Sequence, residues 1–217
     1  MKQIIKNRFN IVLIVGILIL YGAFLSLDMF SIPRSIPSRY LKYASIVLCF
    51  VFATSLMHQS SNKKDSIYVV IALIFTMAAD TFLLFTHHKE VGVFFFCLVQ
   101  LTYLKRYNAA FFKAGICFGL LAVFTYFLFQ FQALYVIAAL YAILISSCFF
   151  STFRTKLPKF NLYCARIGML LFILCDIHVA LYNQLSTGSS YYRFVTLSMW
   201  LFYLPSQFLL ALSASHR

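Results

Sequence analysis

Long apolar segments occupy almost the whole chain, and they constrain its fold more than any other feature. One of them runs from residue 9 to residue 27 without a charged side chain, close to the ~20 residues that an α-helix needs to cross a bilayer. Hydrophobic residues make up 63% of the chain and charged residues only 11%, whereas a soluble domain carries about 25% charged residues. The chain lacks the charge to cover a soluble exterior, so we predict an all-α polytopic transmembrane helix bundle.

The apolar segments and the polar turns between them predict eight helices. A single transmembrane domain over residues 1–217 is expected, because no loop is long enough to fold alone. The helix at 91–104 is among the shortest, and a bundle of seven crossings, in which it enters the membrane without spanning it, is the alternative. The predicted helices cover residues 9–27, 41–57, 66–86, 91–104, 109–129, 133–153, 162–182 and 194–213.

The basic residues predict how the bundle is oriented. An even number of crossings puts both termini on one side, and most of the 18 Lys and Arg residues fall in the turns on that side. By the positive-inside rule both termini are therefore predicted to be cytoplasmic. A basic start before an apolar run also resembles a signal peptide. The run is too long for one and ends in a poor cleavage site at Asp28, so a retained first helix is favoured.

The formal net charge of +13 does not indicate nucleic-acid binding. The basic residues form short clusters between apolar segments, where they set topology and contact lipid headgroups. The six cysteines form no CxxC pair, so we predict reduced, small hydrophobic side chains. The histidines lack metal-ligand spacing, and no nucleotide-binding or serine-hydrolase motif occurs. No metal and no cofactor is therefore expected.

Two carboxylates inside apolar segments are the main candidates for catalysis. Asp176 stands within the apolar segment 167–181, and Asp80 has a similar setting. A charged side chain in hydrocarbon costs roughly 2.5–3.5 kcal/mol, so each is a functional-site hypothesis. Each lies six residues before the outer end of its predicted helix, which is about 9 Å deep at 1.5 Å per residue. Two carboxylates at one depth can share one cavity.

Polar side chains on two further helices follow helical spacing. Gln100 and Tyr103 fall on one face of the fourth predicted helix, and Tyr203 and Gln207 on one face of the last. Together with the two aspartates they could converge on a polar pocket open toward the outer leaflet. The alternative is structural: an aspartate that only hydrogen-bonds between helices, and tyrosines that only pack at interfaces.

These residues resemble the lysoplasmalogenase (YhhN-like) family of membrane proteins. Residues 168–176 resemble its G-x-x-L-F-x-x-[ST]-D motif, and 203–207 are similar to its closing Y-x-x-x-Q. Residues 79–83 resemble its G-D-x-x-L motif, and 92–103 its G-x-x-x-F-x-x-x-H-x-x-Y motif. The resemblance extends over about residues 40–212.

The chain departs from this family pattern at three positions. Ala79 stands where the family has glycine, Cys175 where it has a hydroxyl residue, and Gln100 where it has histidine. A histidine titrates near neutral pH and a glutamine does not. If that histidine transfers protons in the family, activity or substrate could differ in this chain.

The resemblance implies hydrolysis of the vinyl ether bond of a lysoplasmalogen or a related lysophospholipid to a fatty aldehyde and a glycerophospho-base. Asp80 and Asp176 would then be the catalytic acid and base, much as paired carboxylates act in glycoside hydrolysis. The residues that would position water and the headgroup are Gln100, Tyr103, Tyr203 and Gln207, with Lys42, which falls where the family carries a lysine, at the phosphate.

Two other functions fit the same residues. One is a small proton- or cation-coupled transporter in which the carboxylates relay protons, and the other is a catalytically silent relative that binds lipid. A pocket closed toward the cytoplasm favours the hydrolase, whereas a polar path from face to face favours transport. The expected partner is a membrane lipid, the expected location is the bacterial inner membrane, and the oligomeric state is left open.

Overall fold

The chain is helical throughout the part that the computed structural model describes, which is residues 7–30, 37–107, 133–184 and 190–215 with short pieces between 112 and 124. The all-α prediction is therefore confirmed. The helices are α1 (Arg8–Phe30), α2 (Ser38–Gln59), α3 (Lys63–Phe85), α4 (Lys89–Tyr107), α6 (Ala133–Ser151), α7 (Lys159–Gln184) and α8 (Ser190–Leu212).

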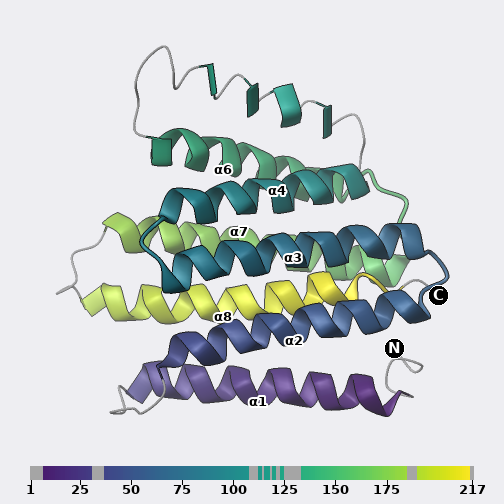
Figure 1. The fold of residues 1–217 in the computed structure, drawn as a ribbon, viewed down its shortest axis with the longest axis horizontal. Helices are drawn as coiled ribbons and strands as arrows, with labels where there is room; N and C mark the ends of the chain where they lie inside the picture. Colours follow the sequence, from purple (N-terminus) through teal and green to yellow (C-terminus); the bar gives the residue numbers. More distant parts are fainter. Residues whose placement is uncertain are drawn as a thin grey trace.

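Each of these helices begins and ends within four residues of its predicted bounds. Six of the described helices (α1, α2, α3, α6, α7 and α8) are long and apolar enough to cross a membrane. Helix α4 is a continuous helix of 19 residues that packs along α3 (Figure 1). The helix predicted at 109–129 and the turn after it lie largely outside the described residues; the pieces that are described there are helical.

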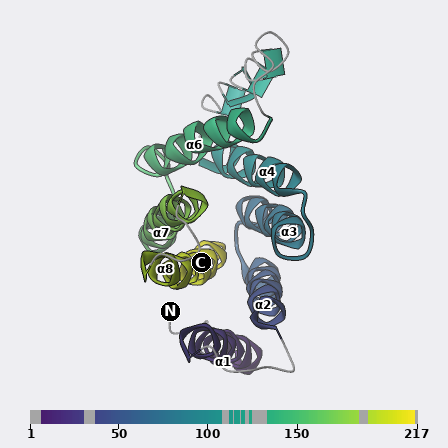
Figure 2. The same ribbon diagram turned by 90° about the vertical axis from the view of Figure 1, so that its left-hand side faces the viewer.

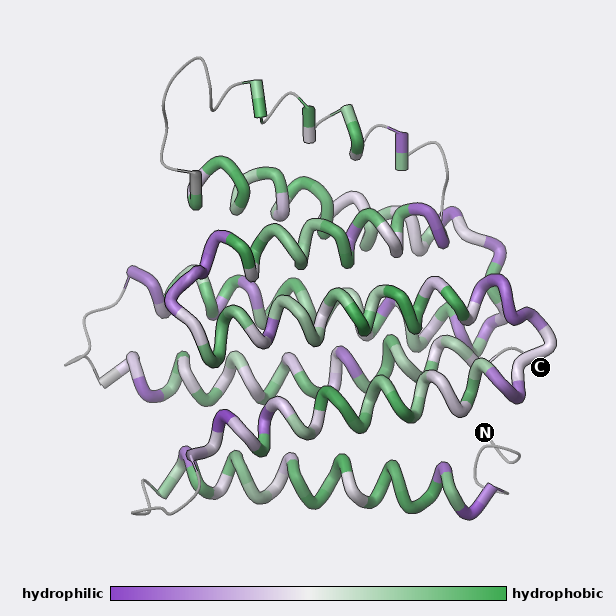
Figure 3. Tube along the Cα trace, in the orientation of Figure 1, coloured by the Kyte–Doolittle hydropathy of each residue, from purple (hydrophilic) through white to green (hydrophobic). Residues whose placement is uncertain are grey.

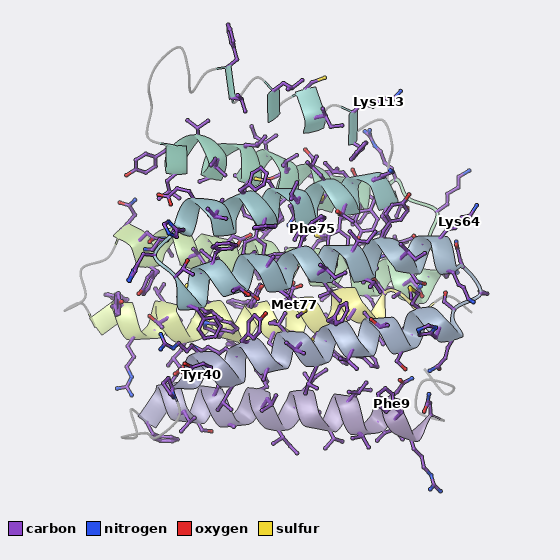
Figure 4. All side chains as sticks on the ribbon, viewed as in Figure 1. Phe9, Tyr40, Lys64, Phe75, Met77 and Lys113 are labelled. Atoms are coloured by element: carbon purple, nitrogen blue, oxygen red, sulfur yellow. The ribbon has the colours of Figure 1, made fainter. Side chains whose placement is uncertain are left out.

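The helices lie side by side, and α1 begins at the end of the bundle where α8 stops (Figure 1). We call this the basic end, because Lys64 and Lys113 extend from it while Tyr40 lies at the opposite end (Figure 4). Hydrophobic residues dominate the middle of the helices, and hydrophilic residues gather toward their ends (Figure 3). Which face of the membrane the basic end occupies stays a prediction from the positive-inside rule.

Six helices form a ring when the bundle is viewed along its length (Figure 2). Each packs against the next in the order α2, α3, α4, α6, α7 and α8, and α8 packs back against α2. Helix α1 packs outside the ring against α2 and α8. Side chains that point inward from these six helices can therefore meet in the centre of the ring.

Two glycines allow the helices that carry the candidate residues to approach closely. A Cβ atom on Gly92 of α4 would lie 2.6 Å from the side chain of Leu83 and 3.2 Å from the carbonyl oxygen of Ala79, both on α3. A Cβ atom on Gly168 of α7 would lie 2.9 Å from the side chain of Leu210 on α8. A larger residue would require a shift between α3 and α4 at position 92, or between α7 and α8 at position 168.

A proline within α8 anchors helix α1. Pro205 has no N–H group to donate to the carbonyl of Leu201 four residues earlier. The hydroxyl of Tyr21 on α1 donates to that carbonyl oxygen at 2.9 Å instead. The carbonyl that the proline leaves without its helical partner thus binds α1 to the ring.

Candidate active site

The first candidate carboxylate, Asp80 of α3, is bound by a tyrosine from α8. Asp80 is 4% exposed, and the hydroxyl of Tyr203 lies 2.9 Å and 2.8 Å from its two oxygens. A hydroxyl has one hydrogen to donate, so this hydrogen is shared between the two carboxylate oxygens. The structure therefore brings together two residues that were predicted from separate motifs.

The second carboxylate, Asp176 of α7, is bound by a tyrosine that is absent from the residues predicted above. The hydroxyl of Tyr141 on α6 donates to Oδ2 of Asp176 at 2.6 Å. Asp176 is half-buried, which makes it more accessible than Asp80. A tyrosine in an apolar helix is most often part of the core, and the available signal was a hydroxyl midway along an apolar segment.

The two aspartate–tyrosine pairs, Asp80–Tyr203 and Asp176–Tyr141, both pack against Phe96 through their tyrosine rings. The ring of this residue, on α4, is centred 6.3 Å from that of Tyr203 and 6.0 Å from that of Tyr141. Both carboxylates also lie close enough to the thiol of Cys175 to interact with it electrostatically. The pairs therefore belong to one region of the interior. Direct sharing of a proton between the carboxylates stays a prediction.

Four fully buried polar side chains lie nearby, and we call them the unpartnered layer. Each has 0% exposure, and within the described residues their polar side-chain atoms form no hydrogen bond of regular geometry. The amide of Gln100 does lie close enough to the hydroxyl of Tyr141 to interact with it. Leaving a buried polar group without a partner costs about 1–3 kcal/mol, so such groups are suited to bind water or a polar part of a ligand. The layer consists of Gln100 and Tyr103 from α4 and Ser206 and Gln207 from α8.

A second polar cluster, the closing network, joins four helices at the basic end. The guanidinium of Arg106 donates to both oxygens of Asp65 at 2.6–3.0 Å. It also donates to the hydroxyl of Ser213 at 2.7 Å and to its carbonyl oxygen at 2.8 Å. That carbonyl oxygen also accepts a bond of 2.9 Å from the amide of Asn161. Four helices, α3, α4, α7 and α8, are thereby tied together.

The buried state of Arg106 corrects one interpretation of the sequence. The positive-inside count treats it as a residue that contacts lipid headgroups, but it is only 8% exposed and is bound to Asp65 inside the bundle. The neighbouring Lys105 is exposed, as the count requires. Two neighbouring basic residues of α4 thus differ in environment: Lys105 is at the surface, whereas Arg106 is inside the bundle.

The closing network also fixes how deep the unpartnered layer lies. Because Arg106 bonds to Ser213, α4 and α8 are at one level there. Gln100 and Gln207 each lie six residues before these positions, about 9 Å along the helix at 1.5 Å per residue. Tyr203 lies one turn further. The interior thus runs from the closing network through the unpartnered layer to the aspartate–tyrosine pairs.

The last predicted site residue, Lys42 of α2, lies beside the aspartate–tyrosine pairs. It is 7% exposed, and its Nζ atom is 2.8 Å from Oδ2 of Asp28 on α1. The same atom lies 4.8 Å from the centre of the Trp200 ring, which packs edge-on against Tyr203 at 5.2 Å. Contact between Lys42 and a phosphate stays a prediction.

The described residues contain no group of three or more His, Cys, Asp or Glu side chains that could hold a metal ion. His178, the histidine nearest in sequence to Asp176, bonds to the carbonyl oxygen of Leu174 at 2.7 Å and packs against the ring of Phe202. The six cysteines carry free thiols.

Comparison with known proteins places these residues in a family. Residues 38–214 match the YhhN family. The match includes both aspartate–tyrosine pairs, the unpartnered layer and the closing network, whereas α1, with Tyr21 and Asp28, lies outside it. No curated protein and no solved structure matches the chain.

Proposed function

Because the chain belongs to the YhhN family, which is the lysoplasmalogenase family, we propose that it hydrolyses the vinyl ether bond of a lysoplasmalogen. The observation that carries this proposal is the pair of carboxylates, buried Asp80 and half-buried Asp176, each held by a tyrosine whose ring packs against Phe96. Two carboxylates inside a ring of membrane helices suit a substrate that enters from lipid and reacts by proton transfer.

The first step is protonation of the double bond. One aspartate, in its acid form, gives its proton to the alkenyl carbon that does not carry the ether oxygen. The π electrons form the new C–H bond, and the carbon attached to oxygen becomes an oxocarbenium ion. The ionised partner stabilises this cation, as the second carboxylate does in glycoside hydrolysis. Burial and mutual repulsion favour one proton between the two acids.

Water then completes the reaction. A water molecule adds to the oxocarbenium carbon while a carboxylate accepts one of its protons, which gives a hemiacetal. The C–O bond to the glycerol unit breaks, the glycerol oxygen takes up a proton, and a fatty aldehyde is released. One water is consumed, and the acid and the base return to their starting forms.

The tyrosines and amides have supporting roles in this scheme. Tyr203 and Tyr141 donate to the carboxylates and hold them in fixed orientations. In the unpartnered layer, the amide of Gln207 has no hydrogen-bond partner in the described part of the chain, and the amide of Gln100 lies beside the hydroxyl of Tyr141. They are suited to bind the attacking water. Phe96 supplies an apolar surface against which both tyrosine rings pack.

The closing network favours hydrolysis over transport. A transporter needs a polar path that opens toward each face in turn. At the basic end, Arg106 and Asp65 instead form a buried ion pair that is also bonded to α8. Opening a path there would break several charge-assisted hydrogen bonds, each worth roughly 1.5–3 kcal/mol. This arrangement supports a site closed toward the basic end.

The test is aldehyde release from a lysoplasmalogen by the purified protein. Asp80→Asn and Asp176→Asn each remove a group that can give or take a proton, so kcat is expected to fall by about 10²–10⁴-fold. Glu90→Gln, which alters an exposed carboxylate of α4, is the matched control and leaves kcat unchanged. Aldehyde release that survives both aspartate substitutions would reject the mechanism, and no release by the unmodified protein would favour a silent lipid-binding relative.

A further inference from the structure

A buried ion pair lies beside the aspartate–tyrosine pairs, away from the closing network. Nζ of Lys42 is 2.8 Å from Oδ2 of Asp28, and their side chains are only 9% and 15% exposed. Removing two charges from water costs several kcal/mol per ion, and apolar residues of similar size often stabilise a protein as well or better. The fold alone therefore gives little reason for this pair.

Aromatic rings surround the lysine ammonium. It lies 4.8 Å from the centre of the Trp200 ring and 5.9 Å from that of Phe24, and these two rings pack edge-to-face at 5.6 Å. A carboxylate combined with aromatic faces is a setting that attracts ammonium groups, quaternary ones included. The chain's own lysine occupies such a setting here.

The ion pair is also close to the proposed reaction site. The ring of Trp200 contacts Lys42 on one side and the ring of Tyr203 at 5.2 Å on the other, and Tyr203 binds Asp80. In a lysophospholipid a glycerol unit separates the phosphate from the ether oxygen. A headgroup at the ion pair would therefore bring the ether bond toward Asp80.

We propose that Asp28 and Lys42 together bind the zwitterionic headgroup of the substrate, a phosphate carrying an ammonium group such as phosphocholine or phosphoethanolamine. Lys42 contacts the phosphate, and Asp28 contacts the ammonium together with the faces of Phe24 and Trp200. Lys42 then faces the phosphate and Asp28 faces the headgroup ammonium, so that opposite charges alternate. A headgroup without an ammonium offers Asp28 no cationic group. This inference rests on the proposed function for the identity of the lipid.

Asp28 brings α1, which lies outside the residues that match the family, into this site. It lies outside residues 38–214, which match the YhhN family, whereas Lys42 lies inside them. The bond from Tyr21 to the carbonyl of Leu201 holds α1 against α8 one to two turns from the ion pair. Headgroup selectivity is thus expected to depend on α1, and the chemical step on the ring.

The chain contains a single tryptophan, so its fluorescence reports directly on this site. The protein, in uncharged maltoside micelles, is titrated with saturated 1-alkyl lysophospholipids, which have no vinyl ether to cleave, bearing phosphocholine or phosphoglycerol headgroups. The phosphocholine ligand is expected to bind about tenfold more tightly, or better. Asp28→Asn removes this preference by weakening phosphocholine binding, and Lys42→Met weakens the binding of both ligands.

Two further variants keep the test decisive. Glu90→Gln changes an exposed carboxylate and retains the preference. The double variant Asp28→Lys, Lys42→Asp keeps an ion pair but exchanges the positions of the two charges, so it is expected to lose the preference for phosphocholine. It provides the test if Asp28→Asn fails to fold. An unchanged ratio of affinities in Asp28→Asn, or in the double variant where the single one does not fold, would overturn the proposal.

The outcome separates this inference from the proposed function. Headgroup preference that depends on Asp28, without aldehyde release from lysoplasmalogens, would refute the hydrolase and leave the headgroup site standing. Aldehyde release that depends on Asp80 and Asp176, without any such preference, would refute the headgroup site alone.

Discussion

The closing network and the unpartnered layer are both polar clusters inside the bundle, about two turns apart along α4 and α8, yet they differ in hydrogen bonding. Arg106 donates to an aspartate, a hydroxyl and a carbonyl oxygen. Gln207, fully buried six residues before Ser213, has no hydrogen-bond partner for either amide atom among the described residues. Both clusters lie inside the bundle, so they are distinguished by their hydrogen bonds. The polar groups of the closing network have protein partners, which indicates a structural role, whereas those of the unpartnered layer are available to a ligand or to water.

The energetic consequences of this difference are opposite in sign. Removing one member of a satisfied, charged network leaves its partner buried and uncompensated, which destabilises strongly. Removing a polar group that has no protein partner removes a cost of burial. A buried polar group without a partner lowers stability, and a chain is expected to retain such a group mainly at a functional site. Stability measurements can therefore test whether the two clusters have different roles.

The largest effect is expected in the closing network. Arg106→Met keeps the apolar stem of the side chain but removes the guanidinium that binds Asp65 and Ser213 inside the bundle, so the free energy of unfolding should fall by about 3–5 kcal/mol. Denaturant unfolding of the purified protein in detergent micelles measures the change. Asp65→Leu combined with Arg106→Met removes both charges and should recover most of the loss. A loss below about 1 kcal/mol in the single variant would contradict the structural role.

A smaller effect on stability, with a clear effect on activity, is expected in the unpartnered layer. Gln100→Leu and Gln207→Leu replace buried amides by apolar groups of similar size, so the free energy of unfolding should stay the same or rise by about 1 kcal/mol. Aldehyde release should fall roughly tenfold or more, because the amides are proposed to hold the attacking water. If the free energy of unfolding of both variants fell by about 2 kcal/mol while aldehyde release stayed intact, both amides would have a structural role instead.

Most of the fold could be predicted from the sequence because span-length apolar segments leave a chain few alternatives to helices. Asp80, Tyr203 and Gln207 could be identified because a polar residue in an apolar segment stands out. Tyr141 could not, because tyrosine is common in this chain and its hydroxyl becomes informative only beside Asp176. Contacts between helices depend on how the helices pack, and the spacing of residues within one helix does not predict that packing.

Charged residues near helix ends were the least predictable from the sequence. Arg106 and Lys105 are neighbours with the same charge, yet one is buried in the closing network and the other is exposed. Asp28 lies at the end of an apolar segment, where the sequence indicates only a boundary, and it proves to be the partner of a buried lysine. Whether such a residue is buried or exposed depends on the rotation of its helix about its own axis. Packing against the neighbouring helices fixes that rotation.

The smallest effect on stability is expected from replacing a buried serine by alanine. This substitution gives the closest comparison, because it can be made both beside the closing network and in the unpartnered layer. Ser66 and Ser206 are each fully buried. The hydroxyl of Ser66, next to the closing network, bonds to Ser60 at 2.9 Å and to the carbonyl oxygen of Ala214 at 2.7 Å, whereas that of Ser206 has no partner among the described residues. Ser66→Ala should lower the free energy of unfolding by about 1 kcal/mol, and Ser206→Ala should leave it unchanged or raise it slightly. Equal losses in the two variants would show that the layer around Ser206 is bonded as fully as the closing network, and the case for a ligand-binding interior would then rest on the aspartate–tyrosine pairs alone.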